Sequence, residues 1–216
     1  MKDNREALRP YLADMVAVEK HILEAVERQR NDDDIKQFPD ALQIIGRIES
    51  VLQSHVQSLE SHLQGYSGGG AAGAVKEAVT GVLGAIAGVY DKIRKDPASR
   101  ALRDDYTALS LASISNGMLH TTALGLSQGT VAELAKRHLE EINSLIMELG
   151  LIVPRIVLKE LSFEGYPIET GISERAVQAI RESWSRSSVH ETAGVASTLG
   201  GSSSSGTSST GGSFNR

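Results

Sequence analysis

Residues 39–64 read PDALQIIGRIESVLQSHVQSLESHLQ, and this stretch decides the fold class. Apolar residues recur in it every three or four positions, which places them on one face of an α-helix. The inward positions are Leu42, Ile45, Ile48, Leu52, Val56, Leu59 and Leu63. At about 1.5 Å per residue, such a helix is long enough to cross a small domain. The stretch therefore predicts a long amphipathic helix with one buried face.

The same spacing continues on both sides of this stretch, and no convincing run of alternating β-branched residues interrupts it. We therefore expect an all-α protein with four long bundle helices and a crossover helix between the second and third of them. The expected helices cover residues 7–30, 39–64, 74–95 (the crossover), 99–124 and 130–161, with a short amphipathic helix at 173–185. Gly150 and Pro154 are expected to kink or break the helix over 130–161.

Glycine and serine mark the loops. The stretch GYSGGGAAG at 65–73 predicts a loop before the crossover helix. In residues 197–213 every residue except Leu199 is Ser, Gly or Thr, so there is almost no apolar surface to offset the entropy of ordering it. We expect one helical domain over residues 1–187 and a flexible, disordered tail over 188–216.

Composition excludes several classes of protein. The 216 residues contain 22 Lys and Arg against 27 Asp and Glu, without a basic cluster, which argues against a nucleic-acid partner. There is no cysteine, which excludes disulfides and thiolate chemistry. No apolar run approaches the roughly 18 residues of a membrane span, so none is expected. The charged start MKDNREALRP is unlike a secretory signal and favours a cytoplasmic location.

No motif for an organic cofactor is present. The chain has no Gly-x-Gly-x-x-Gly, no phosphate-binding Gly-Lys-Ser/Thr loop, no Gly-x-Ser-x-Gly and no His-Glu-x-x-His. We therefore expect no organic cofactor and no catalytic residues of these classes.

Polar residues within the apolar stripes carry the functional information, because an unpaired buried charge is costly unless a partner or a metal ion compensates it. Glu19 lies four residues after Met15 and four before Leu23, on the inward face of its helix. The candidate metal ligands are Glu19, His55, His62, Asp105, His120, His138 and Glu141. Imidazole and carboxylate together suit iron, manganese or zinc.

Structural interpretations of the same residues stay open. Glu19 can be paired with His55 or His62 without any metal ion. His120 can be a satisfied histidine in the core or at its rim. His138 and Glu141 can form the solvated edge of an amphipathic helix.

The helix order and several short segments resemble the ferritin-like superfamily, and within it the bacterial stress-associated YciF-type domain. The similar segments are YLADMVAVEKHILEAV (11–26), HVQSLESHLQ (55–64), YDKIRKDP (90–97), LRDDYTALSLASIS (102–115) and RHLEEINSLIMEL (137–149). The resemblance implies an up-down four-helix bundle with a long crossover helix. It also implies metal ligands at Glu19, His55, Asp105 and Glu141.

Ser58 and Thr107 stand where this family places further carboxylates. Bundles with two metal ions also use Glu-x-x-His, and none of the six histidines has an acid three residues before it. The first functional hypothesis is therefore a stress-response protein with a degenerate or mononuclear metal site and no ferroxidase activity. The alternative is a non-enzymatic bundle without metal that acts through protein contacts or self-association.

Partners are predicted only in outline. We expect a homo-oligomer, with a dimer through the flank of the bundle as the expectation. The apolar Gly/Ala-rich helix at 74–95 and the segment around Trp184 are candidate docking surfaces for another protein. The tail over 188–216 has the composition of a flexible tether, and such a tether can load a ferritin-like protein into a protein shell.

Overall fold

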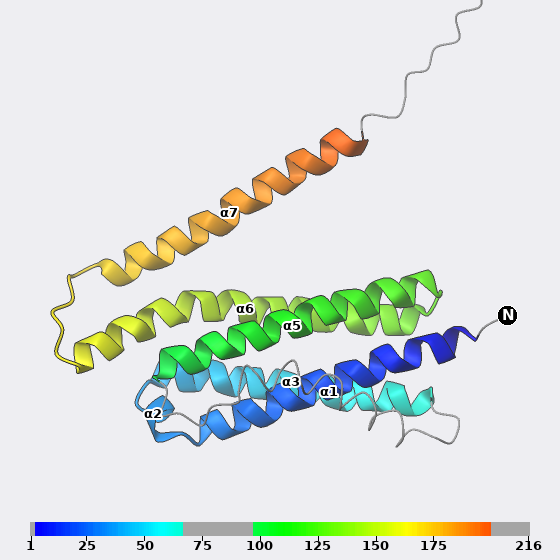
Figure 1. The fold of residues 1–216 in the computed structure, drawn as a ribbon, viewed down its shortest axis with the longest axis horizontal. Helices are drawn as coiled ribbons and strands as arrows, with labels where there is room; N and C mark the ends of the chain where they lie inside the picture. The colour runs from blue at the N-terminus through cyan, green and yellow to red at the C-terminus, as the bar shows by residue number, and fades with distance from the viewer. Residues whose placement is uncertain (1–2, 67–96, 200–216) are drawn as a thin grey trace, which may run out of the picture. The chain divides into compact units, whose positions relative to one another are not determined.

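The computed structural model describes residues 3–66 and 97–199, with side chains described up to residue 186, and this part of the chain contains six α-helices and no strand (Figure 1). The helices are α1 (Asn4–Arg30), α2 (Asp33–Lys36), α3 (Pro39–Gly65), α5 (Ala98–Gly125), α6 (Gly129–Phe163) and α7 (Ile172–Leu199). The all-α expectation is confirmed. The expected crossover helix and its loop at 65–73 lie almost wholly outside the described residues. The chain divides into two compact units, Met1–Ser173 and Glu174–Arg216.

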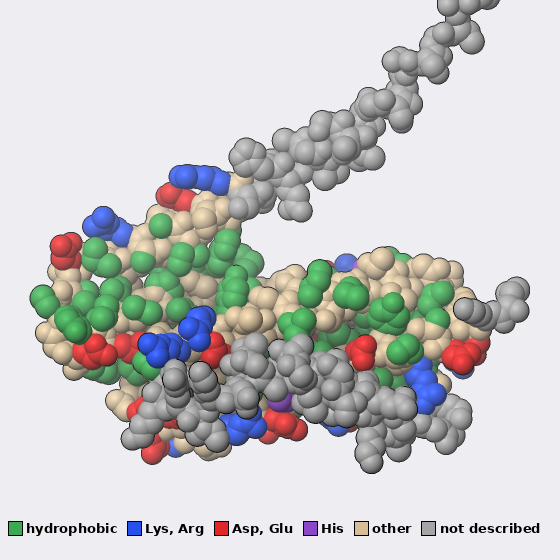
Figure 2. All heavy atoms as spheres, viewed as in Figure 1, with side chains coloured by type: hydrophobic (Ala, Val, Ile, Leu, Met, Phe, Trp, Pro, Cys, Tyr) green, Lys and Arg blue, Asp and Glu red, His purple; other side chains and the backbone are tan. Residues whose placement is uncertain are grey.

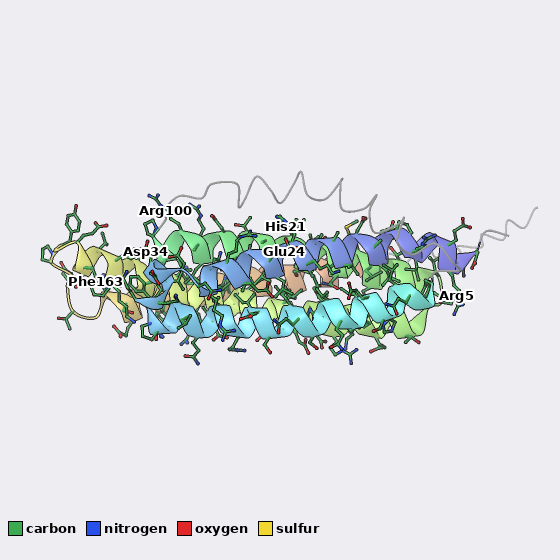
Figure 3. The ribbon with its side chains drawn as sticks, turned by 90° about the horizontal axis from the view of Figure 1, so that it is seen from below. Arg5, His21, Glu24, Asp34, Arg100 and Phe163 are labelled. Carbon is green, nitrogen blue, oxygen red and sulfur yellow. The ribbon has the colours of Figure 1, made fainter. Side chains whose placement is uncertain are left out.

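Four long helices form the first unit. Helix α1 packs against α3 and α5, and α6 packs against the same two helices, so the contacts close a ring of four. Figure 3 shows these helices running alongside one another over most of their length. Each helix presents one apolar face to the ring, as the spacing in the sequence predicted.

Side chains satisfy backbone groups at several helix ends. The Asp3 carboxylate accepts a hydrogen bond from the Arg5 N–H at 2.9 Å and caps α1. Helix α5 follows Pro97 and has no cap of its own. Instead Glu160 of α6 accepts hydrogen bonds from the Ser99 N–H at 2.8 Å and the Ser99 hydroxyl at 2.5 Å. A carboxylate at a helix N-terminus also interacts favourably with the helix dipole.

Two helices run past the positions at which they were expected to break or end. Helix α6 continues through Gly150 and Pro154 to Phe163, so the expected break is absent. Proline removes one backbone hydrogen bond, but the buried residues Leu149 and Ile156 on either side pack into the core and hold the helix together. Helix α7 runs to Leu199, well past the expected end at residue 185, so the flexible tail expected from residue 188 is wrong for residues 188–199, which are helical. Residues 200–216 lie outside the described part.

The interior of the first unit holds two apolar clusters. The first cluster includes Val18, Ile22, Val26, Ile44, Ile45, Ile48, Leu52, Leu102, Leu109, Ala112, Ile142, Leu145 and Leu149. The second cluster includes Leu8, Leu12, Met15, Val16, Leu59, Leu63, Leu119, Val131, Leu134 and Ala135. At the end of the unit that holds α2, the ring of Phe38 lies 5.5 Å from that of Phe163, which is labelled in Figure 3.

The surface of the first unit carries exposed hydrophobic side chains along α5 and α6, as Figure 2 shows. They include Ile114 and Met118, which are 62% and 54% exposed, and Met147, which is 54% exposed. None of the described helices has both the length and the apolar composition needed to cross a membrane.

Candidate metal centre

A layer of four buried polar side chains, here called the polar layer, separates the two apolar clusters. Each of the four long helices supplies one residue of it: Glu19 from α1, His55 from α3, Asn116 from α5 and His138 from α6. None is more than 2% exposed. The helical period explains their orientation, because each falls where its helix passes from one apolar cluster to the other. The prediction that Glu19 points inward is confirmed.

Three members of the polar layer form a compact group of potential metal ligands. Glu19, His55 and His138 each direct one ligand atom to a common region, and the three atoms lie within 4.8 Å of one another. His55 Nδ1 is 3.3 Å from Glu19 Oε2, and His138 Nδ1 is 3.8 Å from Glu19 Oε1. The two imidazole rings are stacked, with centroids 3.6 Å apart and planes within 2° of parallel. One carboxylate and two imidazoles are a ligand set that zinc, iron and manganese accept.

The second nitrogen of each histidine and one oxygen of Glu19 contact further side chains. His55 Nε2 lies 2.6 Å from a carboxylate oxygen of Glu141. His138 Nε2 lies 3.0 Å from the hydroxyl of Ser58. Glu19 Oε1 accepts a hydrogen bond of 3.0 Å from the Asn116 amide. Metal-ligating histidines commonly have such a partner on their second nitrogen, which fixes the orientation and tautomer of the ring.

The hydrogen bonds of Ser58 fix where the proton of His138 resides. The Ser58 hydroxyl donates to the backbone carbonyl of His55 at 2.9 Å, and a carbonyl can only accept. With its proton on that carbonyl, Ser58 accepts a hydrogen bond from His138; this arrangement puts the proton of the neutral imidazole on Nε2 and leaves Nδ1 as a lone pair toward the Glu19 carboxylate. His138 Nδ1 is buried without a hydrogen-bond partner among the described residues, whereas His55 Nδ1 and Glu19 Oε2 form a buried ion pair 3.3 Å apart.

The pKa values of the two histidines move in opposite directions. Burial lowers the pKa of His55, but the contacts with the Glu19 and Glu141 carboxylates raise it by more, so it lies above the ordinary value. Burial, together with the positive charges of His55, Arg137 and His62, lowers the pKa of His138 to about 3. At neutral pH His138 is therefore a neutral imidazole, the form in which histidine binds a metal ion.

The remaining predicted ligands lie outside this group. His62 Nδ1 is 2.9 Å from the Ser58 carbonyl, and His120 Nδ1 is 2.8 Å from the Ala132 carbonyl, so both are bonded to backbone. Asp105 is buried on α5, where its carboxylate accepts a hydrogen bond from Gln29 at 2.9 Å. It lies eleven residues before Asn116, or about 16 Å along the helix.

Glu141 has a different position from the one predicted for a ligand. Its side chain is 47% exposed, and its carboxylate contacts the far nitrogen of His55 rather than the common region. The solvated-edge interpretation therefore describes Glu141 in part, but it does not describe His138, which is 2% exposed.

Sequence reasoning missed the roles of Ser58 and Asn116. Ser58 was read as a lost ligand, yet its hydroxyl orients His138. Asn116 lies near the apolar stripe of α5, which was the available signal. Thr107, the other position expected for a carboxylate, is exposed and bonds the Arg103 carbonyl within its own helix.

Comparisons with protein-family models, curated proteins and solved structures gave no match.

Proposed function

We propose that the protein binds one divalent metal ion, zinc, iron or manganese, inside its helical unit. Glu19, His55 Nδ1 and His138 Nδ1 would hold the ion. Glu141 and Ser58 would orient the two imidazoles from outside, and Asn116 would orient the carboxylate. The ion would supply a buried positive charge and a Lewis acid at this point.

One observation carries the proposal, namely that the lone pair of His138 Nδ1 faces the Glu19 carboxylate 3.8 Å away in the core. Two acceptors at this distance in a low-dielectric interior repel each other unless a cation or proton lies between them. The proton of His55 compensates part of this charge, which is the pairing without metal considered above. A metal ion would satisfy all three atoms at once.

The proposal extends to the kind of protein. The closed ring of four helices supports a ferritin-like bundle, and the polar layer at its centre lies where such bundles bind metal ions. Only one carboxylate is in the group, whereas a di-iron centre uses several. The proposed site is therefore mononuclear, and we expect no ferroxidase activity.

The test is elemental analysis of protein purified without chelators and then incubated with zinc, iron(II) or manganese. We expect close to one ion per chain, and loss of this ion in a Glu19→Gln, His55→Ala double variant. His62→Ala is the matched control, because it removes a histidine two turns further along α3 whose Nδ1 is bonded to backbone. Absence of metal from the wild-type protein after incubation would contradict the proposal and leave Glu19 and His55 as a structural pair.

A second candidate function is self-association, favoured by the exposed Ile114 and Met118 one turn apart on α5. Sedimentation of the wild-type protein should show a dimer that the Ile114→Ser, Met118→Ser variant lacks. A monomer at all concentrations would reject this candidate.

A further inference from the structure

The group of potential ligands contains three donors from three helices. Among residues 3–66 and 97–186, no fourth His, Asp or Glu joins Glu19, His55 and His138. Zinc sites that are purely structural have four protein ligands, whereas sites with three protein ligands keep the fourth position for water or a substrate. The number of donors thus favours a site that takes a ligand from solution.

The fourth helix presents an uncharged amide in place of a fourth donor. The Asn116 amide nitrogen donates to Glu19 Oε1 at 3.0 Å and to the Ala112 carbonyl at 3.1 Å. Its carbonyl oxygen, Oδ1, is buried and has no hydrogen-bond partner among the described residues. Both atoms belong to one carboxamide, and its nitrogen contacts the carboxylate that would bind the ion. A buried carbonyl oxygen without a partner is uncommon and points to an unassigned donor.

The other neighbouring groups are committed elsewhere. Ser58 and Glu141 are bonded to the Nε2 atoms of His138 and His55, on the far sides of the rings. The nearby His62 is bonded to the backbone of its own helix. Asn116 Oδ1 is thus the acceptor in the polar layer that remains for a ligand of the ion.

We infer that the ion keeps one coordination position on the α5 side for water or a small ligand that replaces it, and that Asn116 Oδ1 accepts a hydrogen bond there. This inference rests on the proposed metal site. The four side chains of the polar layer are at most 2% exposed, so the ligand class is limited to molecules of a few atoms.

The test uses cobalt(II) as the metal and azide as the small ligand, with the full chain. Cobalt(II) bound by two imidazoles and one carboxylate gives visible absorption bands that report its coordination. Azide should replace the water and shift these bands in the wild-type protein. If no cobalt(II) binds, the proposed metal site itself fails. If cobalt(II) binds and azide leaves the bands unchanged, the metal site stands and the inference is overturned.

A variant localises the position. Asn116→Asp places a carboxylate of the same size beside the ion, so cobalt(II) should still bind while the apparent azide affinity falls at least tenfold. Asn143→Asp is the matched control, because it adds the same charge at an exposed position on α6. Circular dichroism verifies that both variants are folded. An unchanged azide response in folded Asn116→Asp would overturn the role of Asn116.

Discussion

The apolar clusters and the polar layer occupy the same interior but differ in what explains them. The clusters consist of aliphatic side chains, many fully buried, and their burial stabilises the fold by roughly 1.5–3 kcal/mol per large side chain. The polar layer buries one carboxylate, one amide and two imidazoles. His138 Nδ1 and Asn116 Oδ1 have no hydrogen-bond partner among the described residues. Each such atom reduces stability.

The buried polar residues are not explained by the stability of the fold. A core of four helices is more stable with aliphatic residues throughout, so the packing of the fold does not account for Glu19, His55 and His138. These three residues are the same three whose ligand atoms lie within 4.8 Å of one another. The aliphatic packing and the proposed metal ligands thus lie at separate levels of one helical unit.

The largest expected contrast is in stability without metal. Leu52→Ala, in the first cluster, should lower the free energy of unfolding by about 2–5 kcal/mol, because it leaves a cavity at a fully buried site. His138→Leu, in the polar layer, should change it by less than about 1 kcal/mol, because it removes a buried acceptor that faces a carboxylate. Urea denaturation in the presence of a chelator measures both. Equal losses of unfolding free energy in the two variants would contradict the proposed difference between the apolar clusters and the polar layer.

Bound metal should stabilise a variant of the apolar clusters but not a variant that lacks a proposed ligand. Zinc at 100 times its dissociation constant should raise the free energy of unfolding of the wild-type protein by about 2.7 kcal/mol. Leu52→Ala should gain the same increment, since its site is intact, whereas Glu19→Gln should gain almost none. Thermal unfolding with and without zinc gives these values. A gain in Glu19→Gln equal to that of the wild-type protein would place the ion elsewhere.

A smaller effect is expected from the residue that orients His138. Ser58→Ala should weaken metal binding by about 10- to 100-fold, the usual effect of losing the partner of a ligating histidine. Ser61→Ala is the control, because Ser61 makes the same kind of bond to its own helix, with the Gln57 carbonyl, at an exposed position. Competition with a chromophoric chelator measures both affinities. Comparable affinities in the two variants would show that Ser58 is not part of the site.

A further effect is a pH dependence of the metal-free protein. The pKa of His138 is lowered to about 3 in the folded state, so the unfolded chain binds more protons between about pH 3 and 6.5, and stability should rise with pH over this range. The pKa of His55 is raised, so the folded state keeps its proton above about pH 6.5, and stability should fall as pH rises through that pKa. In each of the two pH ranges, the free energy of unfolding should change by at most about 1.4 kcal/mol per pH unit.

Urea denaturation across this pH range should therefore show a maximum near pH 6.5. His138→Leu should flatten the acid limb alone. The apolar clusters contain no titrating group, so Leu52→Ala should lower the whole curve without changing its shape. A Leu52→Ala curve with a displaced maximum would contradict this assignment.

The sequence predicted the helices well, because the buried face of each repeats with the helical period. The expected range 39–64 differs from α3 by one residue. The end of α6 was less predictable, since packing of Leu149 and Ile156 outweighs the cost of Pro154. The C-terminal end of α7 was not predicted, because no comparable apolar stripe indicates it in the sequence.

The candidate site was predictable only in part. Spacing within one helix showed that Glu19 and His55 face inward. It could not show that His138, rather than His62 or His120, lies at their level, because that level depends on how the helices are placed lengthwise against one another. Ser58 and Asn116 carry no charge, so their role follows from hydrogen bonds that the sequence does not display.

The polar layer also has a consequence for how the chain finds its fold. Aliphatic faces of long helices slide past one another with modest cost, so they specify a lengthwise alignment only weakly. A slip of any one helix by a single turn, about 5.4 Å, would move its polar residue into an aliphatic cluster and separate it from its partners. The four groups therefore fix the lengthwise alignment of the helices. A chain with aliphatic residues at all four positions would be free to assemble in several shifted arrangements.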